Sequence, residues 1–168
     1  MRRFIFTLIA TLALAFTASA QNYAVVNSEK IFKSIVKYNE AIAQLDQLAN
    51  DYQAKVDAKF EEVEKLYNTY MSRRAQLSAA SQAANEENIL KLEQEATEYQ
   101  ESIFGTEGVL MQKRLELIQP IQKEVFAAIE KYAKQKGYDM IIDISQNATM
   151  LYYSERADQT DEIIAMLK

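Results

Sequence analysis

Residues 42–56 read IAQLDQLANDYQAKV, and their apolar residues recur at spacings of three and four positions. The same pattern extends from Tyr38 to Tyr132, with Glu, Gln, Lys and Asp at most positions between. It comprises Ile42, Leu45, Ala49, Tyr52, Val56, Val63, Leu66 or Tyr67, and Tyr70, and then Leu92, Ala96, Tyr99, Ile103, Leu110, Leu117, Ile121, Val125 and Ala128. This is the spacing of a coiled-coil seam. Because the pattern is longer than a globular helix, it predicts a long antiparallel helical hairpin.

The two halves of this hairpin are separated by residues 78–85, SAASQAAN, which lack large apolar side chains. We therefore expect an arm over residues 38–119 with its tip near 78–85. Asn85 is a candidate N-cap for the returning helix, because Glu86 and Glu87 would then lie in a first turn where negative charge suits the helix dipole.

The N-terminus has the pattern of a secretory signal peptide. Arg2 and Arg3 precede the apolar run 4–16, and residues 18–20, Ala-Ser-Ala, offer a small-residue cleavage site. The run is shorter than the roughly twenty residues of a membrane-spanning helix. We therefore expect residues 1–20 to be a signal peptide cleaved after Ala20, and the mature protein to have no transmembrane anchor.

Composition excludes several classes of function. The net charge of -5 argues against a nucleic-acid binder, since affinity for phosphates rests on Lys and Arg. The chain has no His and no Cys, which rules out the usual zinc sites and Ser-His-Asp triads. Its three glycines, at 105, 108 and 137, form no phosphate-binding loop. The sequence thus points away from an enzyme and predicts neither a metal nor a cofactor.

Three residues interrupt the helical pattern of the returning half. Gly105 and Gly108 each cost roughly 1 kcal/mol relative to Ala in a helix. They fit either close helix packing or a bend that lets the arm flex. Pro120 removes one backbone hydrogen bond and typically kinks a helix. All three are hinge candidates.

Residues 21–37 and 120–168 predict a compact, β-rich body. Residues 23–26 read as a strand, and a helix begins at Asn27 or Ser28. After Gly137, the alternation over 138–145 predicts a strand, and 149–153 predicts a second strand that completes a hairpin. Asp158 or Thr160 is placed to cap a short terminal helix.

So few strands and one short helix cannot cover their own apolar faces, which predicts a homo-oligomer. The copy number does not follow from this argument. The candidate oligomerisation core consists of apolar residues from the predicted strands and the terminal helix: Val25, Val26, Met140, Ile142, Ile144, Leu151, Tyr153, Ile163, Ile164 and Leu167.

The mature chain resembles the periplasmic chaperones of the Skp/OmpH family. The resemblance lies in residues 25–27 (VVN), the segment 120–129, residues 136–139 (KGYD) leading into 141–143 (IID), residues 151–153 (LYY), and the ending 158–164 (DQTDEII) with Leu167. It implies a mainly α fold in which helical arms project from a small β-barrel, as a homotrimer of jellyfish shape. It further implies a periplasmic holdase that keeps unfolded outer-membrane proteins in a cavity between the arms, without ATP.

The arms depart from the best-known members, which carry strongly basic arms. Residues 44–119 contain eight Lys or Arg and fourteen Asp or Glu, a net charge of -6. This charge does not favour binding to lipopolysaccharide or anionic lipid. Unfolded clients would then be held by apolar contacts or through their own basic segments.

Large apolar residues at or beside the seam are the candidate client contacts: Tyr67, Tyr70, Met71, Phe104, Leu110 and Met111. Flexible Met and amphipathic Tyr suit promiscuous binding. Packing within the hairpin is the competing interpretation of each residue. The competing function is a structural coiled-coil scaffold or spacer of the cell envelope, which a gap-free seam would favour. Lys59, Gly105 and Thr106 interrupt the seam.

Overall fold

The computed structural model describes residues 22–146 and 149–168, so the expected signal peptide lies outside the described residues. The chain is mostly helical and divides into two compact units. We call residues 36–122 the arm, and the described residues 22–35 and 123–168 the base. The elements, in order, are β1 (Tyr23–Val26), α2 (Ser28–Lys33), α3 (Val36–Arg73), the 3-10 turn η1 (Arg74–Gln76), α4 (Ala79–Phe104), α5 (Val109–Lys136), β2 (Met140–Asp143), the 3-10 turn η2 (Glu155–Ala157) and α6 (Thr160–Met166).

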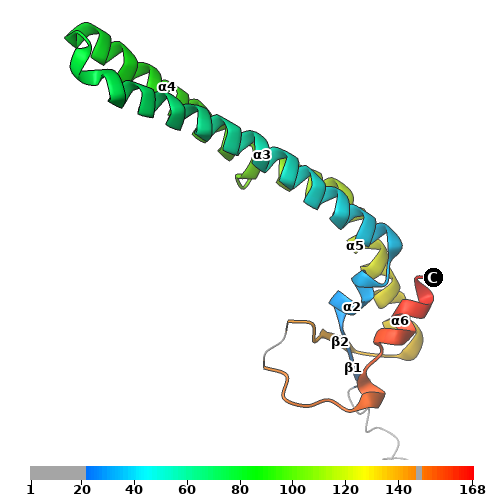
Figure 1. Cartoon of the computed structure of the whole chain (residues 1–168). Helices are drawn as coiled ribbons and strands as arrows, with labels where there is room; N and C mark the ends of the chain where they lie inside the picture. Colours follow the sequence, from blue (N-terminus) through cyan, green and yellow to red (C-terminus); the bar gives the residue numbers. More distant parts are fainter. Residues whose placement is uncertain (1–21, 147–148) are drawn as a thin grey trace, which may run out of the picture. The chain divides into compact units, whose positions relative to one another are not determined.

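In the arm, α3 and α4 pack against each other as an antiparallel hairpin (Figure 1). The buried residues of α4 are Ile89, Ala96 and Ile103, at intervals of seven. That interval keeps one face of a helix toward its partner, as in a coiled coil. The predicted seam is confirmed, because all its positions are buried or half-buried except Tyr67, the alternative to Leu66.

The turn between α3 and α4 lies at residues 74–78. Ser78 is the N-cap of α4, and its hydroxyl accepts a hydrogen bond of 3.2 Å from the Ser81 N–H. The expectation that Asn85 caps this helix is wrong, since Asn85 lies inside α4 and its side chain donates to the Ser81 carbonyl at 2.7 Å. The reason is propensity: the Ala-rich segment 79–84 is a good helix former even without large apolar residues.

The returning half of the arm is two helices, because the chain leaves helical geometry between Phe104 and Val109. A Cβ atom at Gly105 would lie 2.4 Å from the Glu101 carbonyl oxygen, and one at Gly108 would lie 2.5 Å from that of Ile103. Close backbone approach therefore requires both glycines here. Pro120, in contrast, lies inside the continuous helix α5.

In the base, β1 pairs in parallel with β2, in a register from Tyr23 opposite Met140 to Val26 opposite Asp143. The prediction of strands at these two places is confirmed. The predicted hairpin with a strand at 149–153 is wrong, as these described residues form no strand. The other edge of β1 is occupied instead by Asp158, which bridges Val25, and the Gln159 N–H donates to the Val25 carbonyl at 2.9 Å.

A small apolar core holds the base together. Its buried members come from β1, α2, α5 and α6: Val26, Ile31, Val125, Tyr132 and Ile163. Half-buried residues pack around them, namely Phe32, Ile35, Ile129, Tyr138, Ile141, Ile164 and Leu167. Burying one large aliphatic side chain contributes about 1.5–3 kcal/mol, so this cluster stabilises the base.

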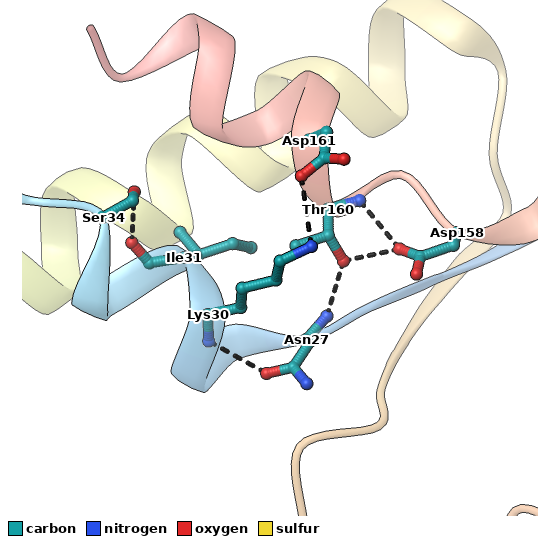
Figure 2. A network of polar contacts seen from close by, with 7 residues as sticks. All are labelled: Asn27, Lys30, Ile31, Ser34, Asp158, Thr160 and Asp161. Atoms are coloured by element: carbon teal, nitrogen blue, oxygen red, sulfur yellow. Dashed lines mark hydrogen bonds and ion pairs between the residues drawn. The ribbon is translucent and has the colours of Figure 1, made fainter.

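Polar contacts join the start of α6 to the start of α2 (Figure 2). The buried Thr160 hydroxyl accepts a hydrogen bond of 2.9 Å from the Asn27 N–H and donates one of 2.5 Å to Asp158. The Asn27 side chain caps α2 by accepting from the Lys30 N–H at 2.9 Å, which confirms the predicted helix start. Thr160 begins α6, and its N–H donates to the Asp158 carboxylate at 3.0 Å. Lys30 also reaches Asp161 at 3.4 Å.

Candidate functional site

The tip of the arm carries a surface pocket of about 440 Å³. This volume falls within the roughly 300–1,000 Å³ typical of ligand sites. Its residues recur at spacings of three and four on both helices, so each helix presents one face to the pocket. They are Tyr67, Tyr70, Met71 and Arg74 from α3 and η1, and Glu86, Ile89, Leu90 and Glu93 from α4.

A polar network among three of the lining residues joins the two sides of this pocket. The Tyr70 hydroxyl donates a short hydrogen bond to the Glu86 carboxylate and accepts one of 3.0 Å from Arg74 Nε. Arg74 also pairs with Glu86 at 3.5 Å. The hydrogen bond to Glu86, followed by burial, raises the pKa of Tyr70 above its ordinary value. Tyr70 therefore stays a neutral donor that links α3 to α4 near the tip of the hairpin.

The rim of the pocket is apolar and accessible to solvent. Tyr67 is 48% exposed, Met71 47% and Leu90 64%. Ile89 lies at the floor and is buried. Adjacent exposed apolar side chains of this kind mark interaction surfaces, whereas scattered single ones do not.

The structure brings together three of the six predicted client contacts. Tyr67, Tyr70 and Met71 line the tip pocket, although Tyr70 is buried. Phe104 and Met111 are exposed and Leu110 is half-buried, and these three flank the break between α4 and α5. They do not line the tip pocket.

The α4 side of the pocket was missed from the sequence. Ile89 and Leu90 are not among the predicted client contacts. The sequence does contain a signal for Ile89: it lies seven residues before Ala96, which in turn lies seven before Ile103, so all three share one face of the helix. Glu86 and Glu93 lie on the same face of α4 two turns apart, but a carboxylate in a charged helix gives no signal of its own.

A second pocket, of about 530 Å³, lies at the break between α4 and α5. Its lining is polar and acidic: Glu98, Glu101, Ser102, Gly105, Thr106, Glu107 and Gly108. It contains none of the predicted contacts. The described residues form no cluster of three or more acidic, His or Cys side chains that could hold a metal ion.

The base exposes a separate set of large apolar side chains. Leu151 is 95% exposed and Tyr152 82%, and Tyr23, Met140 and Tyr153 are also exposed. The other candidate oligomerisation residues lie deeper in the base. Val25, Val26 and Ile163 are buried within it, whereas Ile142, Ile144, Ile164 and Leu167 are half-buried.

None of the helices in the described part of the chain combines the length and apolar character needed to cross a membrane. Comparison with curated proteins gives no match. The model of one protein family, described as outer membrane protein (OmpH-like), matches residues 22–167. This family suggests a periplasmic chaperone for outer-membrane proteins and is not known for enzymes. Because the match covers both the arm and the base, the chain belongs to the OmpH-like family.

Proposed function

We propose that this protein is an ATP-independent periplasmic holdase, which binds unfolded outer-membrane proteins along its arms and keeps them from aggregating. The observation that carries this proposal is the tip pocket, where the exposed apolar side chains of Tyr67, Met71 and Leu90 lie together at one rim. A holdase needs many weak apolar contacts and no chemistry. Family membership supports the same function.

The base is proposed to form a homotrimer around a small β-barrel. A two-stranded sheet is marginal by itself, and the base leaves Met140, Leu151 and Tyr152 exposed. Neighbouring copies would bury these side chains and supply strand partners. Residues 1–20 are proposed to be a cleaved signal peptide that directs the chain to the periplasm.

Lipopolysaccharide binding is not part of this proposal. Residues 44–119 carry a net charge of -6, which repels phosphate groups rather than attracting them. Clients would instead be held by apolar contact, assisted by their own cationic residues.

The test is dilution of a chemically unfolded outer-membrane β-barrel protein into buffer with and without purified residues 21–168. Light scattering reports aggregation, and multi-angle scattering reports the size of the complex. The expected result is suppressed aggregation in a particle of three chains and one client. Unchanged aggregation in the presence of a folded oligomer would overturn the holdase function and favour an envelope scaffold.

A further inference from the structure

The tip pocket combines an apolar rim with one unpaired carboxylate. Glu86 forms an ion pair with Arg74 and accepts a hydrogen bond from the Tyr70 hydroxyl. Glu93, two turns further along α4 on the same pocket face, is exposed. No Lys or Arg of the described residues forms an ion pair with its carboxylate.

We propose that the tip pocket binds segments of unfolded chain in which an aromatic or aliphatic side chain stands beside a Lys or Arg. The apolar side chain covers Met71 and Leu90, and the cation pairs with Glu93. This inference rests on the proposed holdase function, because it names the class of client segment that the arm selects.

The charge of the arm favours this occupant over the alternatives. Residues 44–119 have a net charge of -6, so their field attracts cationic segments and repels anionic ones. The same field repels the equally acidic arm of a second copy of this chain. Apolar contact supplies most of the affinity, while the carboxylate supplies discrimination between segments.

The experiment measures fluorescence anisotropy of short labelled peptides with the purified protein. One peptide alternates Phe with Lys, a second alternates Phe with Glu, and a third alternates Ser with Lys. The Phe-Lys peptide is expected to bind tightest. Glu93→Gln should weaken that binding about two- to fivefold, the range of an exposed ion pair, and should reduce its dependence on salt.

Matched controls separate the pocket from the general field of the arm. Glu87→Gln removes the same charge from the same helix outside the pocket, and it should leave binding nearly unchanged. Leu90→Ser should weaken the Phe-Lys peptide about three- to tenfold through lost apolar contact. Leu115→Ser, at another exposed leucine of the arm, should not. Circular dichroism verifies that all four variants are folded.

Equal effects of Glu93→Gln and Glu87→Gln would overturn the inference, as would equal binding of the Phe-Lys and Phe-Glu peptides. Suppressed aggregation of the unfolded barrel protein without any peptide binding would overturn the pocket and leave the holdase function standing. Peptide binding that depends on Glu93, without suppression of aggregation, would overturn the holdase function and retain the pocket.

Discussion

The backbone N–H of Asn27 donates a hydrogen bond of 2.9 Å to the hydroxyl of Thr160, across 133 positions of the chain. Thr160 is nearly inaccessible to solvent, and its hydroxyl in turn donates to Asp158. One side chain thus satisfies two polar groups that the fold withdraws from water. A buried group left without a partner costs more than the hydrogen bond itself contributes.

Thr160→Val, which keeps the shape and removes the hydroxyl, is expected to lower the free energy of unfolding by about 1–3 kcal/mol. Urea denaturation followed by circular dichroism measures the loss. The control is Thr97→Val, because the Thr97 hydroxyl is exposed and bonds only within its own helix. That change should stay within about 0.5 kcal/mol. Equal losses in the two variants would contradict a special role for Thr160.

Asp143 makes the stability of the base depend on pH. Burial raises the pKa of this carboxyl, but hydrogen bonds from Ser28 and Ser145 outweigh burial and hold the pKa below its ordinary value. The ionised Asp143 carboxylate therefore stabilises the fold at pH values above about 3.9, the ordinary pKa of Asp. This stabilisation is lost as the pH falls through the folded-state pKa.

Asp143→Asn should therefore lower the melting temperature at neutral pH. The difference in melting temperature between the variant and the wild type should shrink below about pH 4. Thermal denaturation across this range measures both. Asp46→Asn is the control, since Asp46 is exposed and makes no hydrogen bond or ion pair within the described chain. A difference that grows with acidity would contradict the hydrogen-bonded carboxylate.

Gly108→Ala is expected to lower the free energy of unfolding by about 1–3 kcal/mol, the cost of inserting a methyl group into a close-packed site. Its Cβ would meet the backbone of Ile103, which a side-chain rotation cannot relieve. Thr106→Ala, in the same turn but exposed, serves as control. An unchanged midpoint in urea for Gly108→Ala would show that the turn relaxes freely.

Replacement of both glycines tests whether the break between α4 and α5 acts as a hinge. Gly105→Ala and Gly108→Ala combined are expected to reduce arm motion and client binding together, because the turn loses its glycine geometry. Distance distributions between spin labels on the arm and the base measure the motion. Unchanged distributions and unchanged aggregation suppression would reject the hinge.

Leu151→Asp is expected to dissociate the proposed oligomer. Leu151 is exposed in the single chain, so a neighbouring copy would bury it, and burying an unpaired charge at this position is costly. Sedimentation velocity should then report a smaller species. Leu115→Asp, on an exposed arm position, should leave the sedimentation coefficient unchanged. A monomeric wild type, or an intact oligomer with Asp at 151, would contradict this surface as the interface.

The hairpin could be predicted from sequence because its signal is local. Residues three and four apart on one helix share a face, and the predicted seam residues Val56 and Tyr70 of α3, like Ala96 and Ile103 of α4, are buried in the structure. The cap of α4 was missed because Asn85 has the usual side chain of an N-cap, while the helix propensity of the alanines before it was stronger. Both signals lie in the same eight residues, and only the structure decides between them.

The strand pairing of the base could not be predicted, because neither partner of β1 is near it in sequence. Alternation within 138–145 indicates a strand but carries no information on its neighbour, and the nearest candidate, 149–153, was the wrong one. Only the α3 side of the tip pocket could be predicted, because the pocket also depends on a pairing between separate segments. Its α3 residues carry aromatic and Met side chains, whereas its charged half becomes visible only when α4 is placed opposite.

The pairing of β1 also sets the order in which this chain can fold during synthesis. The α3–α4 hairpin needs only a short turn, so it can form as soon as residue 104 has appeared. β1 is the first of the described elements to emerge, yet Asp143 and Gln159, which complete its two edges, come near the end. Until then the apolar strand Tyr23–Val26 has both edges open, the condition that invites pairing with other chains. The arms are therefore complete while the newborn protein still has an unprotected strand of its own.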